Sequence, residues 1–242
     1  MVNAHIIPRS FFELVRGKGK HSVGIVIDKD TYSTPFLQAG PSDESILGNC
    51  CEPKFSEWDD YGFKILGKKW DTKDAISSSD GTTPMAFELN AVDYDKLSLF
   101  VLSVLWRASI SSHRFFKNVS LGPEFEERVR QLLLSRNPPG PAEFSIVFCA
   151  TPDHKYRATI LRPDQIRTPE GIKFYRIYLP YIFILIRADS RAAPFPLNLI
   201  MLRRTAWNYI FCFPYGQSPW RALEKTPGEL RKRRWVGKGK RE

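Results

Sequence analysis

Five titratable side chains in the first 60 residues have types and spacings that could support hydrolytic chemistry. They are His5, at the start of a His-Ile-Ile-Pro sequence, and the carboxylates Glu44, Glu52, Asp59 and Asp60. An imidazole changes charge near neutral pH and therefore suits a general base. Carboxylates are the hard oxygen donors that Mg²⁺ and Mn²⁺ prefer.

Each of these residues also has an ordinary structural interpretation. His5 could be a surface residue near a chain end, and Glu52 could interact with the dipole of the helix that Pro53 is expected to open. Asp59 and Asp60 could lie on a solvated helix face. The order of the elements along the chain distinguishes these interpretations from a shared site.

The His-Ile-Ile-Pro sequence is followed by Glu44-x-x-Leu47 and then by Cys51-Glu52-Pro53. This order resembles one branch of the HNH (His-Me finger, ββα-metal) endonuclease superfamily, which typically shows SHIIP, a variable insert and ExxLCxxCE at a helix start. The similarity covers roughly residues 4–135. Its downstream part comprises Leu105 to Ser109, Phe116, Val119, Leu121-Gly122 and Glu126 to Arg130.

The resemblance implies a β-hairpin followed by a helix, with a divalent cation between them. Phosphodiester cleavage needs a base that activates water and a cation that stabilises the scissile phosphate. By position in the motif, His5 would be the base and Glu52 a ligand of Mg²⁺ or Mn²⁺. Glu44, Asp59 and Asp60 would be further candidates, either as ligands or to orient water and His5.

The chain departs from this family pattern at several positions. Ala4 stands where many relatives carry a polar or acidic residue, and Gly48 stands where the first downstream cysteine is expected. No CxxC precedes His5, and Cys50-Cys51 do not form a tetrahedral zinc site, so they are expected to be buried small hydrophobes and a structural zinc is not expected. Hydrophobic packing would replace that zinc, through Phe11, Phe12, Phe55 and Trp58.

Two alternatives to an active nuclease stay open. The first is a catalytically degenerate copy that binds nucleic acid, or forms a complex, without cleaving. The second is an unrelated α+β domain with a chance His-Ile-Ile-Pro sequence, in which His5 and Glu52 would lie far apart.

The charge distribution favours a polyanionic partner. The formal net charge is +10; residues 1–90 carry 10 Lys and Arg against 13 Asp and Glu, and the rest carries 26 against 13. DNA is favoured over RNA, and a protein partner or a homo-oligomer stays open. A basic C-terminal tail is the clearest phosphate-binding candidate, against a merely solubilising or membrane-surface role. Its cations are Arg231, Lys232, Arg233, Arg234, Lys238, Lys240 and Arg241.

Hydrophobic periodicity predicts an α+β fold. Helices are expected over residues 9–16, from Pro53 onward, over 93–109 with Asp93 as N-cap, and over 124–136. Strands are expected over 1–8, 21–28, 144–149, 157–161 and 207–213, and over 174–186 in one or two pieces. These elements predict a nuclease-like unit over 1–70, a loop or linker over 71–92, a helical and then β-rich body over 93–228, and the basic tail over 229–242.

The cysteine pattern and the N-terminus indicate a cytoplasmic protein. Four cysteines without CxxC spacing do not suggest a secreted disulfide framework, and no signal peptide is visible. The strongest apolar run, from Ile177 to Ile186, is too short to span a bilayer as a helix, so no membrane partner is expected. The resemblance adds the expectation of a bacterial defence or toxin effector.

Overall fold

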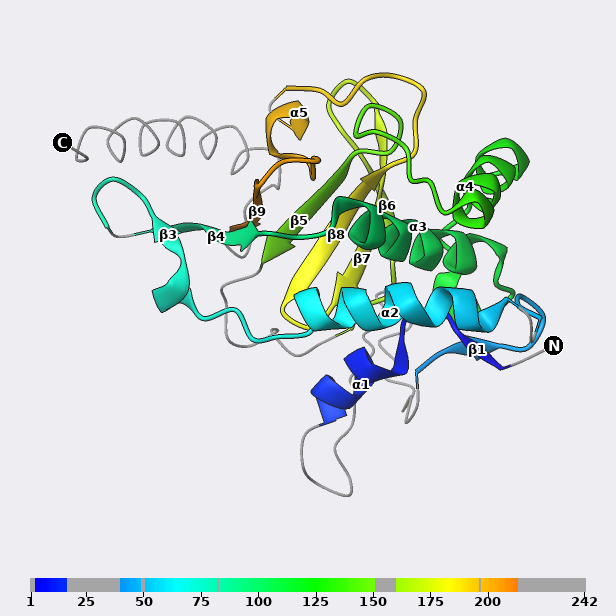
Figure 1. Ribbon diagram of the computed structural model, residues 1–242. Coiled ribbons are helices and arrows are strands. Elements are labelled where there is room, and N and C mark those ends of the chain that lie inside the picture. The colour runs from blue at the N-terminus through cyan, green and yellow to red at the C-terminus, as the bar shows by residue number, and fades with distance from the viewer. Residues whose placement is uncertain are drawn as a thin grey trace.

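The computed structural model describes residues 3–16, 40–48, 51–81, 83–150, 160–195 and 197–212. Within these ranges the N-terminal half contributes most of the helices, and a seven-stranded mixed sheet comes mostly from the C-terminal half (Figure 1). The predicted α+β class is therefore confirmed. The strand expected over 21–28, most of that over 157–161, and the basic tail lie outside the described residues.

The helices agree closely with the apolar periodicity of the sequence. Asp93, the predicted N-cap, accepts hydrogen bonds from the backbone nitrogens of Asp95 and Lys96 at 3.0 and 3.1 Å. The described helices are α1 (Arg9–Arg16), α2 (Glu52–Leu66), α3 (Tyr94–Ile110), α4 (Pro123–Ser135) and α5 (Leu197–Ile200), with 3₁₀ turns η1 (Thr72–Asp74) and η2 (Arg114–Phe116).

The strands form two sheets. A two-stranded sheet pairs β1 (Ala4–His5) with β2 (Ser42–Asp43). The seven-stranded sheet has the order β3-β4-β9-β5-β8-β7-β6, antiparallel throughout except for the parallel pair β5–β9. Its strands are β3 (Ile76–Ser77), β4 (Pro84–Asn90), β5 (Ile146–Ala150), β6 (Asp164–Arg167), β7 (Lys173–Leu179), β8 (Ile182–Arg187) and β9 (Trp207–Cys212).

The segment 71–92 is not the loop that the sequence predicted, because it contains η1, β3 and β4. Residues Ala86 to Asn90 of β4 pair with β9, which places β4 inside the sheet. From Phe87 onward, the buried Phe87 and Leu89 alternate with the exposed Glu88 and Asn90, and such a period-two pattern is typical of a half-buried strand. A loop was predicted here because the Ser, Asp and Gly residues that precede β4 are typical of turns.

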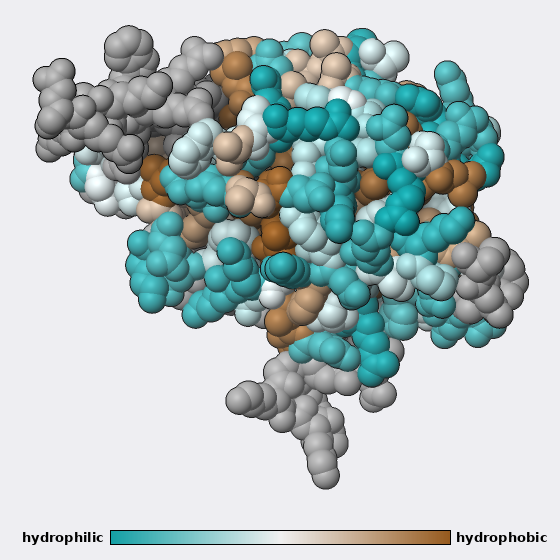
Figure 2. All heavy atoms as spheres, in the orientation of Figure 1, coloured by the Kyte–Doolittle hydropathy of each residue, from teal (hydrophilic) through white to brown (hydrophobic). Residues whose placement is uncertain are grey.

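Most of the hydrophobic core lies between the sheet and helices α2, α3 and α4. One cluster of buried side chains extends from Ala4 to Cys212, so the expected N-terminal unit and the body share a core. A second cluster, which includes Leu197 of α5, covers the other sheet face. The face seen in Figure 2 is mainly hydrophilic, with apolar side chains visible between polar ones. Among the described residues, no helix is long and apolar enough to cross a bilayer.

Candidate active site

His5 lies on a short ribbon beside α2. In the β1–β2 pair, Ala4 is opposite Asp43 and His5 is opposite Ser42. Ala4 and Ile6, the neighbours of His5, are both buried, whereas His5 is only half-buried. Figure 1 shows β1 running beside the N-terminal half of α2. Along the chain the order is β1, α1, β2, α2, and β1 lies close to the N-terminal half of α2, at an angle to it.

The guanidinium of Arg107, a residue of α3, joins β1 to α2. Its Nη1 donates to the backbone carbonyl of His5 at 2.7 Å and to Oδ2 of Asp59 at 2.9 Å. Its Nη2 donates to Oδ1 of Asp59 at 2.6 Å and to Oγ of Ser103 at 3.1 Å, and its Nε donates to the carbonyl of Ser103 at 3.2 Å. Arginine has five N–H donors in a rigid planar fork, so each donor here has an acceptor of its own.

This full set of acceptors explains how a charged residue is tolerated in an apolar helix. Only 2% of Arg107 is exposed, and its guanidinium also lies 5.4 Å from the centre of the Phe55 ring. A buried cation is costly unless it is paired and hydrogen-bonded, and the bidentate Asp59 carboxylate supplies the opposite charge. Arg107 is therefore the buried cation of an ion pair between α3 and α2.

Asp59 can reach Arg107 because it lies at the border of the buried face of α2. Phe55, Gly62 and Leu66, which are spaced three or four residues from Asp59 or from one another, are all buried on that face. Burial raises the pKa of the Asp59 carboxyl, while the neighbouring Arg107 and His5 act to lower it. Asp59 is therefore part of an internal ion pair and is not on a solvated helix face.

The two serines that follow α3 hold β2 through hydrogen bonds to Asp43. Oδ2 of Asp43 accepts hydrogen bonds from the hydroxyl of Ser111 at 2.9 Å and from the backbone nitrogen and hydroxyl of Ser112 at 3.0 and 3.2 Å. Its Oδ1 accepts from the backbone nitrogen and hydroxyl of Ser45. The Ser45 hydroxyl and the other donors hold the pKa of Asp43 well below its ordinary value, with burial opposing.

Ser109 extends this polar segment to α4. Its hydroxyl donates to Oε1 of Glu126 at 2.6 Å and accepts from the backbone nitrogen of Leu121 at 2.8 Å. One stretch of chain, from Ser103 to Ser112, thus contacts β1, β2, α2 and α4 through polar side chains. We call residues 103–112 the α3 anchor.

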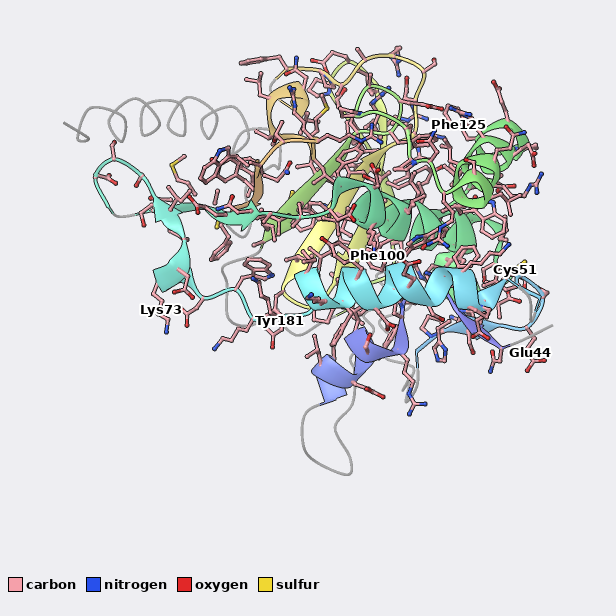
Figure 3. All side chains as sticks on the ribbon, in the orientation of Figure 1. Glu44, Cys51, Lys73, Phe100, Phe125 and Tyr181 are labelled. Atoms are coloured by element: carbon pink, nitrogen blue, oxygen red, sulfur yellow. The ribbon has the colours of Figure 1, made fainter. Side chains whose placement is uncertain are left out.

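Among the predicted site residues, Glu44 and Glu52 are exposed and close to the start of α2. Glu44 follows β2, and Glu52 is the first residue of α2. Figure 3 labels Glu44 and Cys51, the residue before Glu52, at this same end of the helix. Both carboxylates can therefore reach solvent near the β1–β2 ribbon.

The structure does not gather all of the predicted carboxylates. Glu52 and Asp59 are separated by two helical turns, about 10 Å along the axis, and Asp60 is exposed beside Asp59. Across the described ranges, no three His, Cys, Asp or Glu side chains form a group that could hold a metal ion by themselves. The seven predicted cations of the tail, from Arg231 to Arg241, lie outside the described residues.

The chain was compared with protein-family models, curated proteins and solved structures. None of these comparisons finds a match. The geometry of the described residues must therefore support any functional proposal.

The donor chemistry at the start of α2 fits a magnesium-like ion. Mg²⁺ takes oxygen ligands, keeps several waters, and is commonly bound through one or two carboxylates plus substrate phosphate. The exposed oxygens of Glu44 and Glu52 match this requirement, and no sulfur ligand is needed. Asp59 fits less well, because both of its oxygens already accept from Arg107.

The α3 anchor was not expected from the sequence. Asp43, Arg107 and the Ser111-Ser112 pair were not singled out as site residues. A usable signal did exist, since an arginine that follows the apolar run Leu97 to Leu105 on the same helix face must find acceptors if it is buried.

His113 has a local structural role. Its Nδ1 accepts a hydrogen bond from the backbone nitrogen of Phe115 at 3.1 Å, so it caps η2. Burial lowers the pKa of its imidazole, which favours the neutral ring that this acceptor role requires. His113 is therefore a useful control histidine.

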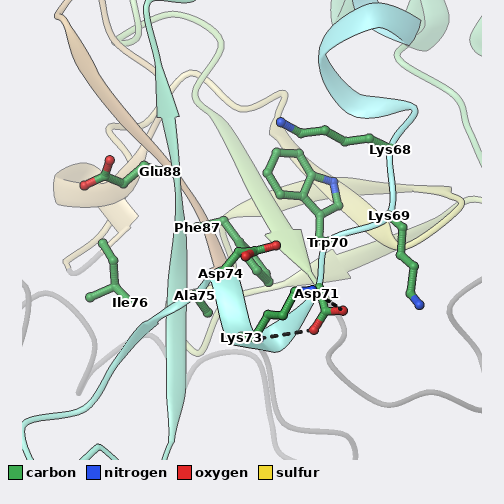
Figure 4. Close-up of a pocket in the computed structure, with 10 residues that line it drawn as sticks. All are labelled: Lys68, Lys69, Trp70, Asp71, Lys73, Asp74, Ala75, Ile76, Phe87 and Glu88. Carbon is green, nitrogen blue, oxygen red and sulfur yellow. Dashed lines mark hydrogen bonds and ion pairs between the residues drawn. The ribbon is translucent and has the colours of Figure 1, made fainter.

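A cavity of about 520 Å³ lies at the opposite end of α2 from Glu52 (Figure 4). Its wall includes Trp70 and Phe87, with three lysines and three carboxylates around them. Lys73 pairs with Asp71 at 3.9 Å. The charges balance, and none of the predicted site residues lines this cavity, so it is separate from the His5 site.

Proposed function

We propose that this protein is a divalent-metal-dependent endonuclease that hydrolyses phosphodiester bonds, with DNA favoured over RNA as substrate. The observation that carries the proposal is the position of His5. It lies on a β1–β2 ribbon beside the N-terminal half of α2, and Arg107 links its backbone carbonyl to a carboxylate of that helix. This supports the β-hairpin and helix arrangement that the HNH-like sequence pattern implies.

In the proposed reaction, His5 accepts a proton from the attacking water. A half-buried imidazole suits this task, because it is held in place and still reached by solvent. Glu52 and Glu44 are the candidate ligands on the solvent side of the ribbon. A bound divalent cation supplies positive charge to the scissile phosphate and to the leaving oxygen.

Two roles were expected for Asp59, as a ligand of the cation or as a group that orients water and His5, and its hydrogen bonds favour the second. Both of its oxygens accept from Arg107, which in turn donates to the His5 carbonyl. Asp59 therefore helps to hold the proposed base, and the exposed Glu44 and Glu52 are the better candidate ligands.

The experiment is plasmid cleavage by the full chain with Mg²⁺ or Mn²⁺. The wild type is expected to cut, chelation of the metal should stop cutting, and His5→Ala should abolish it. His113→Ala, at the histidine that caps η2, should retain cutting. If His5→Ala cuts as fast as the wild type, His5 is not the base and the proposal fails.

A second candidate is a nucleic-acid-binding subunit that has lost catalysis. The observation in its favour is the neutralisation of Asp59 by Arg107, which leaves fewer carboxylates for a cation. This candidate function predicts that the protein binds DNA but leaves the plasmid uncut at any metal concentration.

A further inference from the structure

Arg107 makes one hydrogen bond that its ion pair with Asp59 does not need. Its Nη1 donates to the backbone carbonyl of His5 at 2.7 Å, across 102 positions of sequence. The charge of Arg107 is already balanced by the bidentate contact with Asp59. The additional bond fixes the main chain at the residue proposed as the base.

Every other donor of the guanidinium is also hydrogen-bonded, which restricts its position. Ser103 accepts from Nε through its carbonyl and from Nη2 through its hydroxyl. The Ser103 hydroxyl in turn donates to the carbonyl of Phe100 at 2.7 Å, which fixes the orientation of this hydroxyl. A single rigid group therefore sets the distance between β1, α2 and α3.

We infer that Arg107 is a positioning residue for His5, holding its backbone against Asp59 so that the imidazole lies where the reaction needs it. The inference rests on the proposed function for its catalytic consequence, but the positioning itself is a structural statement. Lysine cannot substitute, because a single ammonium cannot serve the His5 carbonyl, both Asp59 oxygens and Ser103 in one plane.

Arg187 offers a matched control. It is also buried, at 1% exposed, and it also donates to backbone carbonyls, including those of Glu143 at 3.0 Å and Ala142. Its other contacts are with Ser145, just before β5, and with Asp189 and Arg191, just after β8, and none is on the β1–β2 ribbon. Replacing either arginine should destabilise the fold, but only Arg107 should affect His5.

The first measurement is the NMR signal of the His5 imidazole, assigned by its loss in His5→Gln. In Arg107→Lys this signal should move, and in Arg187→Lys it should stay. In Arg107→Ala, millimolar ethylguanidinium should refill the vacated site and return the signal toward its wild-type position, whereas the same concentration of sodium chloride should not. An unmoved His5 signal in Arg107→Lys overturns the inference, whether or not the protein cuts DNA.

The second measurement is cleavage kinetics at a temperature where thermal unfolding shows every variant to be folded. Arg107→Lys should lower kcat between about tenfold and a hundredfold with KM unchanged, because small misplacements of a reacting group have effects of this size. Arg187→Lys should leave kcat unchanged. Equal kcat in wild type and Arg107→Lys would show that Arg107 only stabilises the fold. Absence of cleavage in the wild type would remove the proposed function, and the NMR result alone would then decide whether Arg107 positions His5.

Discussion

Nη1 of Arg107 lies 2.7 Å from the carbonyl oxygen of His5 and 2.9 Å from a carboxylate oxygen of Asp59. Through this one nitrogen, α3 holds the strand that carries the proposed base against the helix that follows the ribbon. The arrangement suggests that stability and activity depend on the same few polar contacts, and that appropriate variants can separate them.

Replacing Asp59 by asparagine should destabilise the protein strongly. The change leaves the buried Arg107 charge without its counter-ion, and breaking a buried pair on one side typically costs about 3 kcal/mol or more. Asp60→Asn is the matched control, since this exposed neighbour should change the free energy of unfolding by less than about 0.5 kcal/mol. Urea unfolding at neutral pH measures both, and equal values for the two variants would contradict the role of the ion pair.

Asp43 should make the stability of the protein depend on acid pH. Its pKa in the folded state is held below the value near 3.9 that it has when unfolded, so the folded state favours the ionised form. The stabilisation is complete above about pH 4 and declines as the pH falls further, because the unfolded chain then binds the proton first.

Asp43→Asn tests this pH dependence. At pH 7 the variant should be less stable than the wild type by about 2 kcal/mol, because hydrogen bonds to a charged acceptor are lost or weakened. The difference should shrink as the pH is lowered toward 2, whereas exposed Asp74→Asn should follow the wild type throughout. A difference between wild type and Asp43→Asn that stays constant from pH 7 to pH 2 would count against the assignment.

Gly62 allows α2 and α3 to approach each other closely. A Cβ atom at this position would lie 2.4 Å from the Phe100 ring, which is itself buried. Gly62→Ala should therefore destabilise by about 1–3 kcal/mol through overpacking, although alanine is the better helix former. Gly140→Ala, where no atom lies within 4 Å, should be close to neutral. Thermal unfolding of the two variants measures the contrast, and a stabilised Gly62→Ala would show that the helices can separate without cost.

The elements with strong local signals were predictable from the sequence. The apolar spacing of Leu97, Phe100 and Val104, together with the Asp93 cap, indicated α3 to within one residue at either end. The β7–β8 pair was expected as one or two strands; it turns at Pro180-Tyr181, where Tyr181 has a φ of +72°. The short strand expected over residues 1–8 is confirmed as β1, whereas β2 has no periodicity to detect, because pairing with a segment 37 or more positions away defines it.

The candidate site was less predictable for the same reason. His5 was singled out by its motif, but its attachment to Arg107 depends on tertiary contact across the chain. Asp59 was expected as a ligand, as a group that orients water and His5, or as a solvated residue, and the structure shows it paired with Arg107 because it lies at the border of a buried helix face. Sequence patterns identify which groups could do chemistry, whereas packing decides which are already committed to a partner.

Binding of Mn²⁺ to the full chain, measured by calorimetry, tests most directly whether the start of α2 is a metal site. Glu52→Gln should weaken binding at least tenfold, because it removes the proposed ligand. Glu124→Gln is the matched control, since Glu124 is also an exposed glutamate in the first turn of a helix and its loss has the same effect on the helix dipole. The account predicts that Glu124→Gln binds as the wild type does. Equal binding by both variants, or no Mn²⁺ binding by the wild type, would contradict it.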